Sequence, residues 1–564
     1  MIDDTPSARL MAVVLFSGFI FACAPIAYYL ADVERFPIEH TRINTLQPIS
    51  SQYHVTVTVH AHACPSPSDI TGWNSDATFT TLTEILTSKS TTKHPNHNQM
   101  LPTLNPLQII NQLDASSPTR AHEMNIVIVA HPKHEIIGPL HLGPTRRSVI
   151  FVPCNGYQQR IAQELVARAT QLHVVLNADR TKDTDVVSVP HYHISMSLLD
   201  ASPIGRPTPV TWSGSNIKQS LQPFFDRLKD IVSIDLDTQI VRFVKISEKV
   251  HQSCGKTCTV QEKSTQPANF VTPKDLQRIR SLLSDGFTLE SSSISPLISP
   301  LHLIVYVPPH SETPLYIVPS HDVGRSITNE YESIETNVNA TATVAKNSKE
   351  IHLTKDINRL GFYVPRYGGV VVWNIPTIEQ GCDAKSTSSC APNEQALDTI
   401  SDLWVSQLRH LLGVSSTSLS TKNIQYIRSN TGISDWELDT LARGRLSYFA
   451  TRTTKSLAAL SALVVDMSHM AVPVLVGENV VQSLKEYKIA EMKVSNGNIV
   501  QALKHISNAF NYARLAEMDP SMAPLRYFPP KHLAAVYLPL IIPLLIPMLM
   551  GLKKGYVEWK ELKK

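Results

Sequence analysis

Two long apolar runs dominate the hydropathy pattern, one near each end of the chain. Residues 11–31 and residues 533–552 contain no Asp, Glu, Lys or Arg. A helix rises about 1.5 Å per residue, so either run is long enough to cross a hydrocarbon core about 30 Å thick. We predict a transmembrane helix at each run, with residues 32–532 on one side of the membrane.

The two predicted spans differ in chemistry. Pro539, Pro543 and Pro547 recur every fourth residue in the second span and place its irregular backbone on one side. Neighbouring groups must satisfy the carbonyls that proline frees in lipid. We therefore interpret this side as a helix-contacting face; the alternative is a bent span exposed to lipid.

The first run has a second interpretation as a cleavable signal peptide. Ala22-Cys23-Ala24 imitates a small-residue cleavage site, but Pro25 follows it directly. The run is also longer than the usual apolar region of a signal peptide. We predict that this span is retained.

The charges beyond the second span indicate the orientation. Residues 553–564 carry five Lys and two Glu. Positively charged flanking residues stay in the cytoplasm. We expect residues 1–10 and 553–564 to be cytoplasmic and the region between the spans to be luminal or extracellular.

The first part of that region alternates between two periodicities. Strand-like runs of β-branched and apolar residues recur between helix-like stretches at 157–173 and 219–232. This alternation predicts an α/β domain over 32–435. The predicted strands are 54–59, 125–130, 148–152, 187–199 and 301–307, followed by a second strand group at 315–318 and 370–373. Another helix is expected over 394–412, ending near Gly413.

The pattern becomes helical from Trp436. Residues 437–471 and 475–519 contain no proline. Ile499, Leu503, Ile506 and Phe510 recur at helical intervals, which indicates an amphipathic helix. We predict a helical region over 436–532, after the α/β domain and before the second span.

Composition excludes one class of function. The formal net charge is only +3, and charged residues make up 18% of the chain. A nucleic-acid-binding domain would show a concentrated basic surface. We expect no nucleic-acid partner.

Cysteine usage agrees with a compartment outside the cytosol. Cys254 with Cys258, and Cys382 with Cys390, are the close pairs, and we expect them to form disulfides. Free thiols and a zinc site are the alternatives. Asn339 begins an Asn-Ala-Thr sequon in a polar stretch, and we predict a glycan there.

Catalytic motifs are scarce. The pairs His60/His62 and His191/His193 each share a strand face, as metal ligands can, but nothing in the sequence completes either site. Cys154 and Ser215 are the candidate nucleophiles. Ser213-Gly214-Ser215 is interpreted as a polar turn with no helix after it, unlike a nucleophile elbow. We therefore predict no catalytic residue, no metal and no cofactor.

An ordered set of motifs resembles the PIG-S family of the glycosylphosphatidylinositol (GPI) transamidase complex. Arg366-Tyr367-Gly368-Gly369 is similar to the start of a strand in that family, and Pro314-Leu315-Tyr316-Ile317 is similar to its central strand. Trp436-Glu437-Leu438-Asp439 resembles the opening of its helical region. Further similar segments are Leu408–Gly413, Asp519-Pro520-Ser521, Tyr527-Phe528-Pro529 and Tyr537–Leu540.

The resemblance implies a subunit in the endoplasmic reticulum membrane whose large domain faces the lumen. The complex removes a C-terminal signal from a precursor protein and joins the new end to a GPI lipid. In that family a different, cysteine-protease-like subunit carries the catalytic residues. The expected partners are therefore the other subunits and membrane lipid, with GPI and the precursor protein reached through the complex. The expected contribution of this chain is positioning.

Partner contacts are expected at a few residues of these motifs. Arg366 and Tyr367 are candidates, although we favour the alternative that this motif is a tight turn before a buried strand. Trp436 is either a docking residue or a core anchor. Two different classes of protein remain open: a stand-alone membrane-anchored hydrolase of the secretory pathway, and a surface receptor ectodomain.

Overall fold

We describe the protein from a computed structural model of its 564 residues. The described residues are 11, 14, 15, 18, 35–49, 54–61, 105–116, 123–130, 137–153, 164, 167–172, 176, 188–202, 210–244, 251–252, 269–271, 298–313, 315–317, 361–364, 367–375, 390–414, 423–427, 429–467, 470–522 and 530–562. The chain forms two compact units. Residues 50–448 make one, and residues 1–49 with 449–564 make the other.

The first sheet of the 50–448 unit has the strand order β1-β2-β4-β3-β13. All neighbouring pairs are parallel except β3 with β4. Helix α5 (Pro106–Ser116) buries Ile109 and Ile110 against Val127, Val149 and Phe151 of this sheet. The strands are β1 (His54–Ala61), β2 (Glu123–Ala130), β3 (Leu140–Leu142), β4 (Arg147–Val152) and β13 (Ile424–Tyr426).

The second sheet of this unit has the order β11-β12-β9-β5-β6. Only β11 with β12 is antiparallel. Alternation along β5 sends Tyr192, Ile194, Met196 and Leu198 to one face, where they pack under two helices. The strands are β5 (His191–Asp200), β6 (Ser233–Arg242), β9 (Ile298–Val307), β11 (Gly361–Val364) and β12 (Gly368–Val372).

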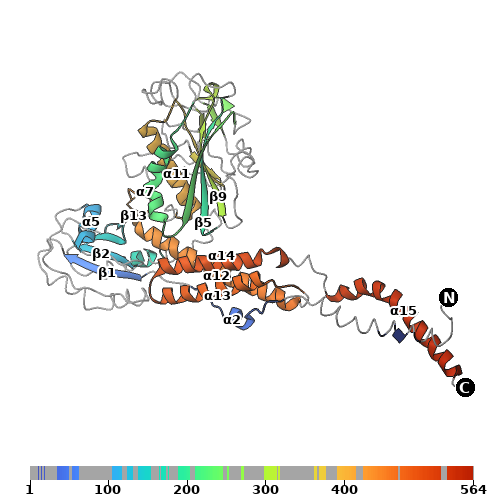
Figure 1. The fold of residues 1–564 in the computed structure, drawn as a ribbon. Coiled ribbons are helices and arrows are strands. Elements are labelled where there is room, and N and C mark those ends of the chain that lie inside the picture. The colour runs from blue at the N-terminus through green and yellow to red at the C-terminus, as the bar shows by residue number, and fades with distance from the viewer. Residues whose placement is uncertain are drawn as a thin grey trace, which may run out of the picture. The chain divides into compact units, whose positions relative to one another are not determined.

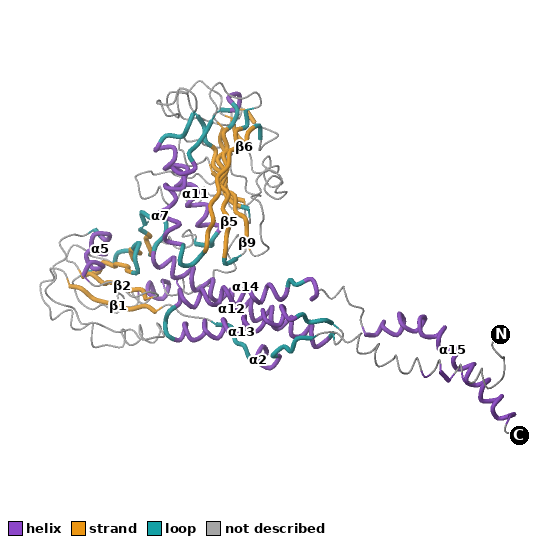
Figure 2. Tube along the Cα trace, viewed as in Figure 1, coloured by secondary structure: helices purple, strands orange, loops and turns teal. Residues whose placement is uncertain are grey.

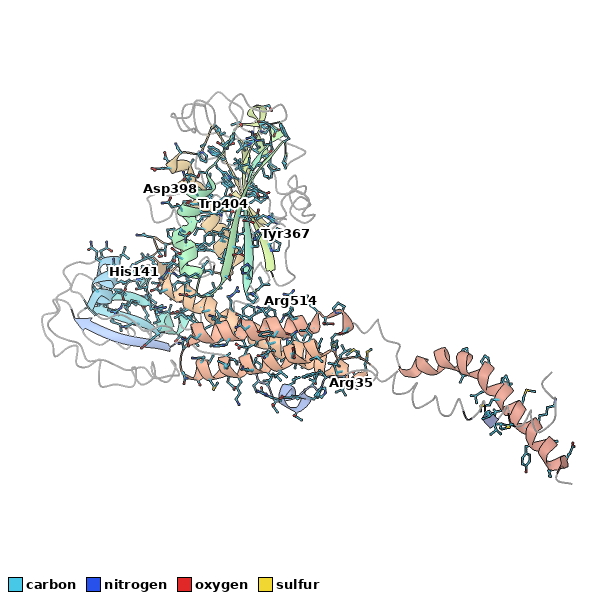
Figure 3. All side chains as sticks on the ribbon, in the orientation of Figure 1. Arg35, His141, Tyr367, Asp398, Trp404 and Arg514 are labelled. Carbon is cyan, nitrogen blue, oxygen red and sulfur yellow. The ribbon has the colours of Figure 1, made fainter. Side chains whose placement is uncertain are left out.

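Helices α7 (Gly214–Leu228) and α11 (Glu394–Leu411) cover that apolar face (Figures 1 and 2). Trp404 of α11 is fully buried in the shared core and meets Trp212 edge to face (Figure 3). Asn393 caps α11 by accepting a hydrogen bond from the Ala396 amide, and Gly413 ends it with φ +75°. The helix end predicted near Gly413 is confirmed.

The opposite face of the second sheet is apolar only at its carboxyl end. Leu199, Ile304, Tyr306, Val370 and Val372 pack there with residues of a small third sheet. That sheet has the order β10-β8-β7, with β7 (His251–Gln252), β8 (Asn269–Val271) and β10 (Leu315–Ile317).

Helices dominate the other unit. Successive helices lie side by side, with the short helix α2 (His40–Asn44) beside them (Figure 2). Their shared core includes Leu457, Val480, Leu484 and Ala513, and α2 adds Ile43. The long helices are α12 (Asp435–Asp466), α13 (Val474–Ser495) and α14 (Ile499–Glu517). The predicted amphipathic stripe of α14 is confirmed, since Ile499, Leu503, Ile506 and Phe510 are all buried.

The structure confirms a mixed α/β fold with a helical C-terminal region, and it corrects several details. Each of the five strands predicted first overlaps an observed one. The strands predicted at 315–318 and 370–373 are observed as β10 and β12. They belong to different sheets: β12 pairs with β9 in the larger one, and β10 pairs with β8 as the last described strand of the small one.

The interpretation of Ser213-Gly214-Ser215 as a turn without a following helix is wrong. Ser213 is the N-cap of α7, which begins at Gly214 rather than at the predicted residue 219. Ser213 has the extended backbone of an N-cap, but its side chain accepts no hydrogen bond from the helix amides, and its hydroxyl lies 2.6 Å from that of Ser215.

Helix α15 spans Pro530–Leu562 and contains Pro539, Pro543 and Pro547. Of the predicted first span, only Met11, Val14, Leu15 and Gly18 are described, each of them helical. Within the described part of the chain, no helix was found that is long and apolar enough to cross a membrane.

Candidate functional site

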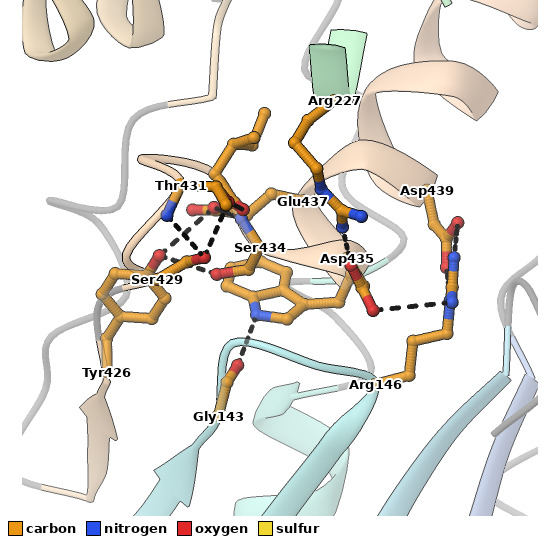
Figure 4. Close-up of polar contacts among 12 residues, drawn as sticks. Gly143, Arg146, Arg227, Tyr426, Ser429, Thr431, Ser434, Asp435, Glu437 and Asp439 are labelled. Atoms are coloured by element: carbon orange, nitrogen blue, oxygen red, sulfur yellow. Dashed lines mark hydrogen bonds and ion pairs between the residues drawn. The ribbon is translucent and has the colours of Figure 1, made fainter. Parts of the chain in front are cut away.

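Among the described residues of the 50–448 unit, an extensive polar cluster surrounds the first turn of α12, which begins in this unit and continues into the other. The sequence Ser434-Asp435-Trp436-Glu437 has the spacing of a capping box, in which a Glu three residues after the cap returns to the cap amide. The Glu437 carboxylate accepts a hydrogen bond from the Ser434 amide at 2.8 Å (Figure 4). The helix start therefore holds Glu437 in a fixed position.

Arg409 of α11 pairs with Glu437. Its Nη2 donates to Oε1 at 2.8 Å and its Nη1 to Oε2 at 3.1 Å. Nη1 also donates to the Gly432 carbonyl at 2.6 Å. The Arg409 side chain is 8% exposed and that of Glu437 is 0% exposed. This is a bidentate pair shielded from water, the strongest geometry for an ion pair.

Tyr426 of β13 is a third hydrogen-bonding partner of the Glu437 carboxylate, besides Arg409 and the Ser434 amide. Its hydroxyl lies 2.8 Å from Ser434 Oγ and donates to Glu437 Oε2 at 3.2 Å. Burial, and secondarily the negative charge of Glu437, raises the pKa of the Tyr426 phenol to about 12.

We expect the Tyr426 pKa to appear as a loss of stability at high pH. An unfolded tyrosine titrates near pH 10, so the unfolded state releases its proton first between pH 10 and about 12, and stability falls through that window. The tyrosinate absorbance of the wild type should differ from that of Tyr426→Phe by one group titrating near pH 12. A difference curve centred at pH 10 would contradict the assignment.

Trp436 joins the same turn to the first sheet. Its ring is 0% exposed, its Nε1 donates to the Gly143 carbonyl at 3.1 Å, and Tyr426 meets it edge to face (Figure 4). A Cβ at Gly143 would lie 2.6 Å from Ile110 Cδ1 and 3.0 Å from the Arg147 carbonyl oxygen, so the space around this turn is tight. The burial favours the core-anchor interpretation of Trp436 over the docking one.

Two further carboxylates on this turn engage arginines of different elements. Asp439 accepts from Arg146 Nε at 2.5 Å and Nη2 at 2.9 Å. Asp435 contacts Arg227 of α7 and lies 3.7 Å from Arg146 Nη1 (Figure 4). Burial and the neighbouring charge of Arg146 lower the pKa of Arg227.

Two buried arginines further along α12, Arg443 and Arg445, also bind other elements, but through backbone carbonyls. Arg443 Nη2 donates to the Leu176 carbonyl at 3.0 Å, and Arg445 donates to the Val189 carbonyl just before β5. Residues 434–445 therefore bind elements of both five-stranded sheets. The cluster fixes these elements relative to each other, and its carboxylates are engaged by arginines.

The Arg366-Tyr367-Gly368-Gly369 motif forms the start of β12. Gly368 has φ +144°, and a Cβ there would lie 1.8 Å from the His302 carbonyl oxygen of β9. A Cβ at Gly369 would lie 1.9 Å from Gln407 Oε1 of α11. The backbone of Gly368 is one that favours glycine, as the turn interpretation expects, and both glycines lie where a neighbouring strand or helix approaches closely. Tyr367 is half-buried, and Arg366 lies outside the described residues.

Sequence reasoning missed a Ser-His-Asp set on β5 and β6. His191 Nδ1 lies 2.9 Å from Ser233 Oγ, and its Nε2 lies 2.9 Å from Asp235 Oδ2. Next to it, His193 Nε2 lies 3.2 Å from Asp237 Oδ2. These are polar pairs across neighbouring strands. The alternation of residues 233–242 was the signal that could have revealed β6.

The other candidates contribute little to a site. The Ser215 hydroxyl contacts Ser213 and Asn216, which supply no general base. Among the described side chains, no three His, Cys, Asp or Glu are grouped as metal ligands. Cys390 is disulfide-bonded. Cys154, Cys254, Cys258, Cys382 and Asn339 lie outside the described residues.

The fold and the polar cluster at residues 434–445 together define a class of protein. It is a mixed α/β protein with a helical region, in which buried ion pairs hold helices and strands in place. The profile of the PIG-S family, described as phosphatidylinositol-glycan biosynthesis class S protein, matches residues 14–562. The chain belongs to the PIG-S family.

Three relatives of this chain are named as components of the GPI transamidase. The GPI-anchor transamidase component PIGS is 24% identical over 381 residues in Bos taurus and 25% identical over 375 residues in Homo sapiens, each alignment covering 66% of this chain. The GPI transamidase component PIG-S homolog of Schizosaccharomyces pombe is 23% identical over 408 residues, or 71% of the chain. The alignments span 59%, 58% and 60% of these relatives, respectively.

Proposed function

We propose that this chain is a non-catalytic subunit of a GPI transamidase complex. It would support the transfer of GPI anchors to the C-termini of precursor proteins by holding partners in register, which lowers the entropic barrier of a reaction without reacting side chains. The observation that carries the proposal is the family match over residues 14–562. The names of the relatives and the ion-paired cluster at α12 support it.

The proposed location is the endoplasmic reticulum membrane, with spans at 11–31 and 533–552, both termini cytoplasmic and the large region luminal. Both runs are free of charged residues, and the tail 553–564 is rich in lysine. The disulfide at Cys390 fits an oxidising lumen. We extend the proposal to disulfides within Cys254/Cys258 and Cys382/Cys390 and to a glycan on Asn339.

The proposed partners are the other subunits, including a cysteine-protease-like chain that performs the transfer. We propose that Arg366 and Tyr367 contact a partner, and that Pro539, Pro543 and Pro547 of α15 form a helix-contacting face. Their spacing of four residues places the prolines along one side of that helix. GPI and the precursor protein would be reached through the complex.

Affinity purification from detergent-solubilised membranes should recover the other subunits with this chain. A tagged, unrelated two-span protein of the same membrane is the control and should recover none of them. Replacing Pro539, Pro543 and Pro547 together with leucine should lower the recovery at unchanged expression, because a regular helix loses the irregular face.

Recovery of the wild-type chain alone would contradict the proposed function. Full recovery with the triple variant would contradict only the role of the prolines.

A further inference from the structure

The connection between α12 and α13 is unusually apolar for a turn exposed to water. Residues 464–477 contain Asp466 as their only Asp, Glu, Lys or Arg. Met470, Val472 and Val476 are buried in the helical core. Val465, Val474 and Leu475 nevertheless remain 64%, 45% and 62% exposed.

The end of α14 adds two more exposed apolar side chains, Leu515 and Met518. Val464 at the end of α12, Val476 at the start of α13 and Ala516 at the end of α14 share one buried core, so the three helix ends lie together. We call the exposed set Val465, Val474, Leu475, Leu515 and Met518 the apolar end.

The other end of α13 has the opposite chemistry. Its connection to α14 is Asn496-Gly497-Asn498, where Gly497 takes φ +75° and Asn498 caps α14. Met492 and Val500 are single exposed apolar residues beside this polar turn, which is ordinary for a soluble surface. The α13 helix therefore joins an apolar turn to a polar one.

The chain that leads from the first predicted span is fastened to the apolar end. Arg35 bridges Val472 and donates from Nη2 to the Val464 carbonyl at 2.8 Å, and the Phe36 amide donates to the Val472 carbonyl at 2.9 Å. Arg35 follows Ala31 by four residues, which reach about 14 Å at most when extended. An anchor ending at Ala31 would thus hold the α12–α13 turn beside the bilayer.

The second predicted span has a looser connection to the same place. Met522 packs in the core with Val472 and Val476, eleven residues before Leu533. Both predicted anchors therefore connect to the helical unit at the apolar end.

We propose that the apolar end rests in the lipid interface of the membrane. The inference depends on the two-span topology of the proposed function. Exposed apolar side chains gain free energy when they enter the boundary between headgroups and acyl chains. The charged side chains nearest in sequence to these residues include the acidic Asp466, Glu478 and Glu517 and the basic Arg514. One basic residue among them does not make the basic cluster that attracts anionic lipid, so the fitting partner is a zwitterionic lipid.

Site-specific fluorescence tests the contact. An environment-sensitive fluorescent amino acid would replace Leu475 in one full-length variant and Met492 in a control. Each variant, with whatever subunits co-purify, is placed in phosphatidylcholine nanodiscs containing a spin-labelled phosphatidylcholine that quenches at the interface. Quenching should be about threefold or more stronger at position 475 than at position 492.

Equal quenching at the two positions would overturn the inference. Weaker quenching at position 475 than at position 492, as expected if a neighbouring subunit covers Leu475, would overturn it as well. The same preparation reports separately on the proposed function. Differential quenching without co-purifying subunits contradicts the transamidase assignment but keeps the lipid contact. Co-purification without differential quenching contradicts the lipid contact alone.

Discussion

Replacing Arg409 with methionine should destabilise the protein by about 3–5 kcal/mol, because it leaves the Glu437 carboxylate buried without a counter-charge. The Glu437 side chain is 0% exposed, and Arg409 supplies both of its guanidinium contacts. The Gly432 carbonyl loses a donor as well. The measurement is the thermal and denaturant unfolding of the purified chain.

A double variant separates the cost of leaving the Glu437 charge unpaired from the cost of losing the packing of the two side chains. Arg409→Met combined with Glu437→Leu should lose less stability than Arg409→Met alone, because apolar residues of similar volume can replace a buried ion pair at little cost. The exposed pair Glu39–Arg42 is the control, with side chains 48% and 43% exposed. Glu39→Gln should cost less than about 1 kcal/mol. A loss in Arg409→Met no larger than this control would refute the prediction.

Gly368→Ala should be the most damaging single-methyl change at the strand β12. Its φ of +144° disfavours any side chain, and the new Cβ would lie 1.8 Å from a backbone oxygen of β9. Backbone strain costs about 1–3 kcal/mol and overpacking about as much again, so the sum approaches the whole stability of a typical domain. We expect loss of folded protein, measured by expression and near-UV circular dichroism.

Gly138→Ala provides the matched comparison. A Cβ at Gly138 meets Phe151 no closer than 3.7 Å. This variant should therefore fold like the wild type. Gly368→Ala that folded with wild-type unfolding behaviour would contradict the β9–β12 geometry.

The sequence predicted strands well where apolar and β-branched residues are continuous. β2, β4 and β9 are buried or nearly so, and each was expected within a few residues of its observed bounds. β6 was missed because Asp235, Asp237 and Gln239 are poor strand formers. As the last of the described strands in its sheet, β6 turns these polar residues to one side while Ile234 and Leu236 support the core.

The polar cluster could be predicted only in its local part. The Ser434–Glu437 capping box is readable from four residues, although we did not predict it. The pairing of Arg409 with Glu437 spans 28 residues, and that of Arg146 with Asp439 spans 293. Such pairs depend on which helices and strands become neighbours, and one sequence holds no local signal of this.

Residues 35–49 belong to the helical unit, yet the helices that complete it begin some 400 residues later. Phe36 packs against Gly477, where a Cβ would lie 1.9 Å from its ring, and the Tyr487 hydroxyl donates to the Gln47 carbonyl at 2.6 Å. Ribosomes add about 5–20 residues per second, so this segment waits roughly 20–80 s for its partners. Residues 50–448 are synthesised during that delay. The core of the helical unit is therefore completed last, and the apolar Phe36 and Ile43 lack their packing partners until then.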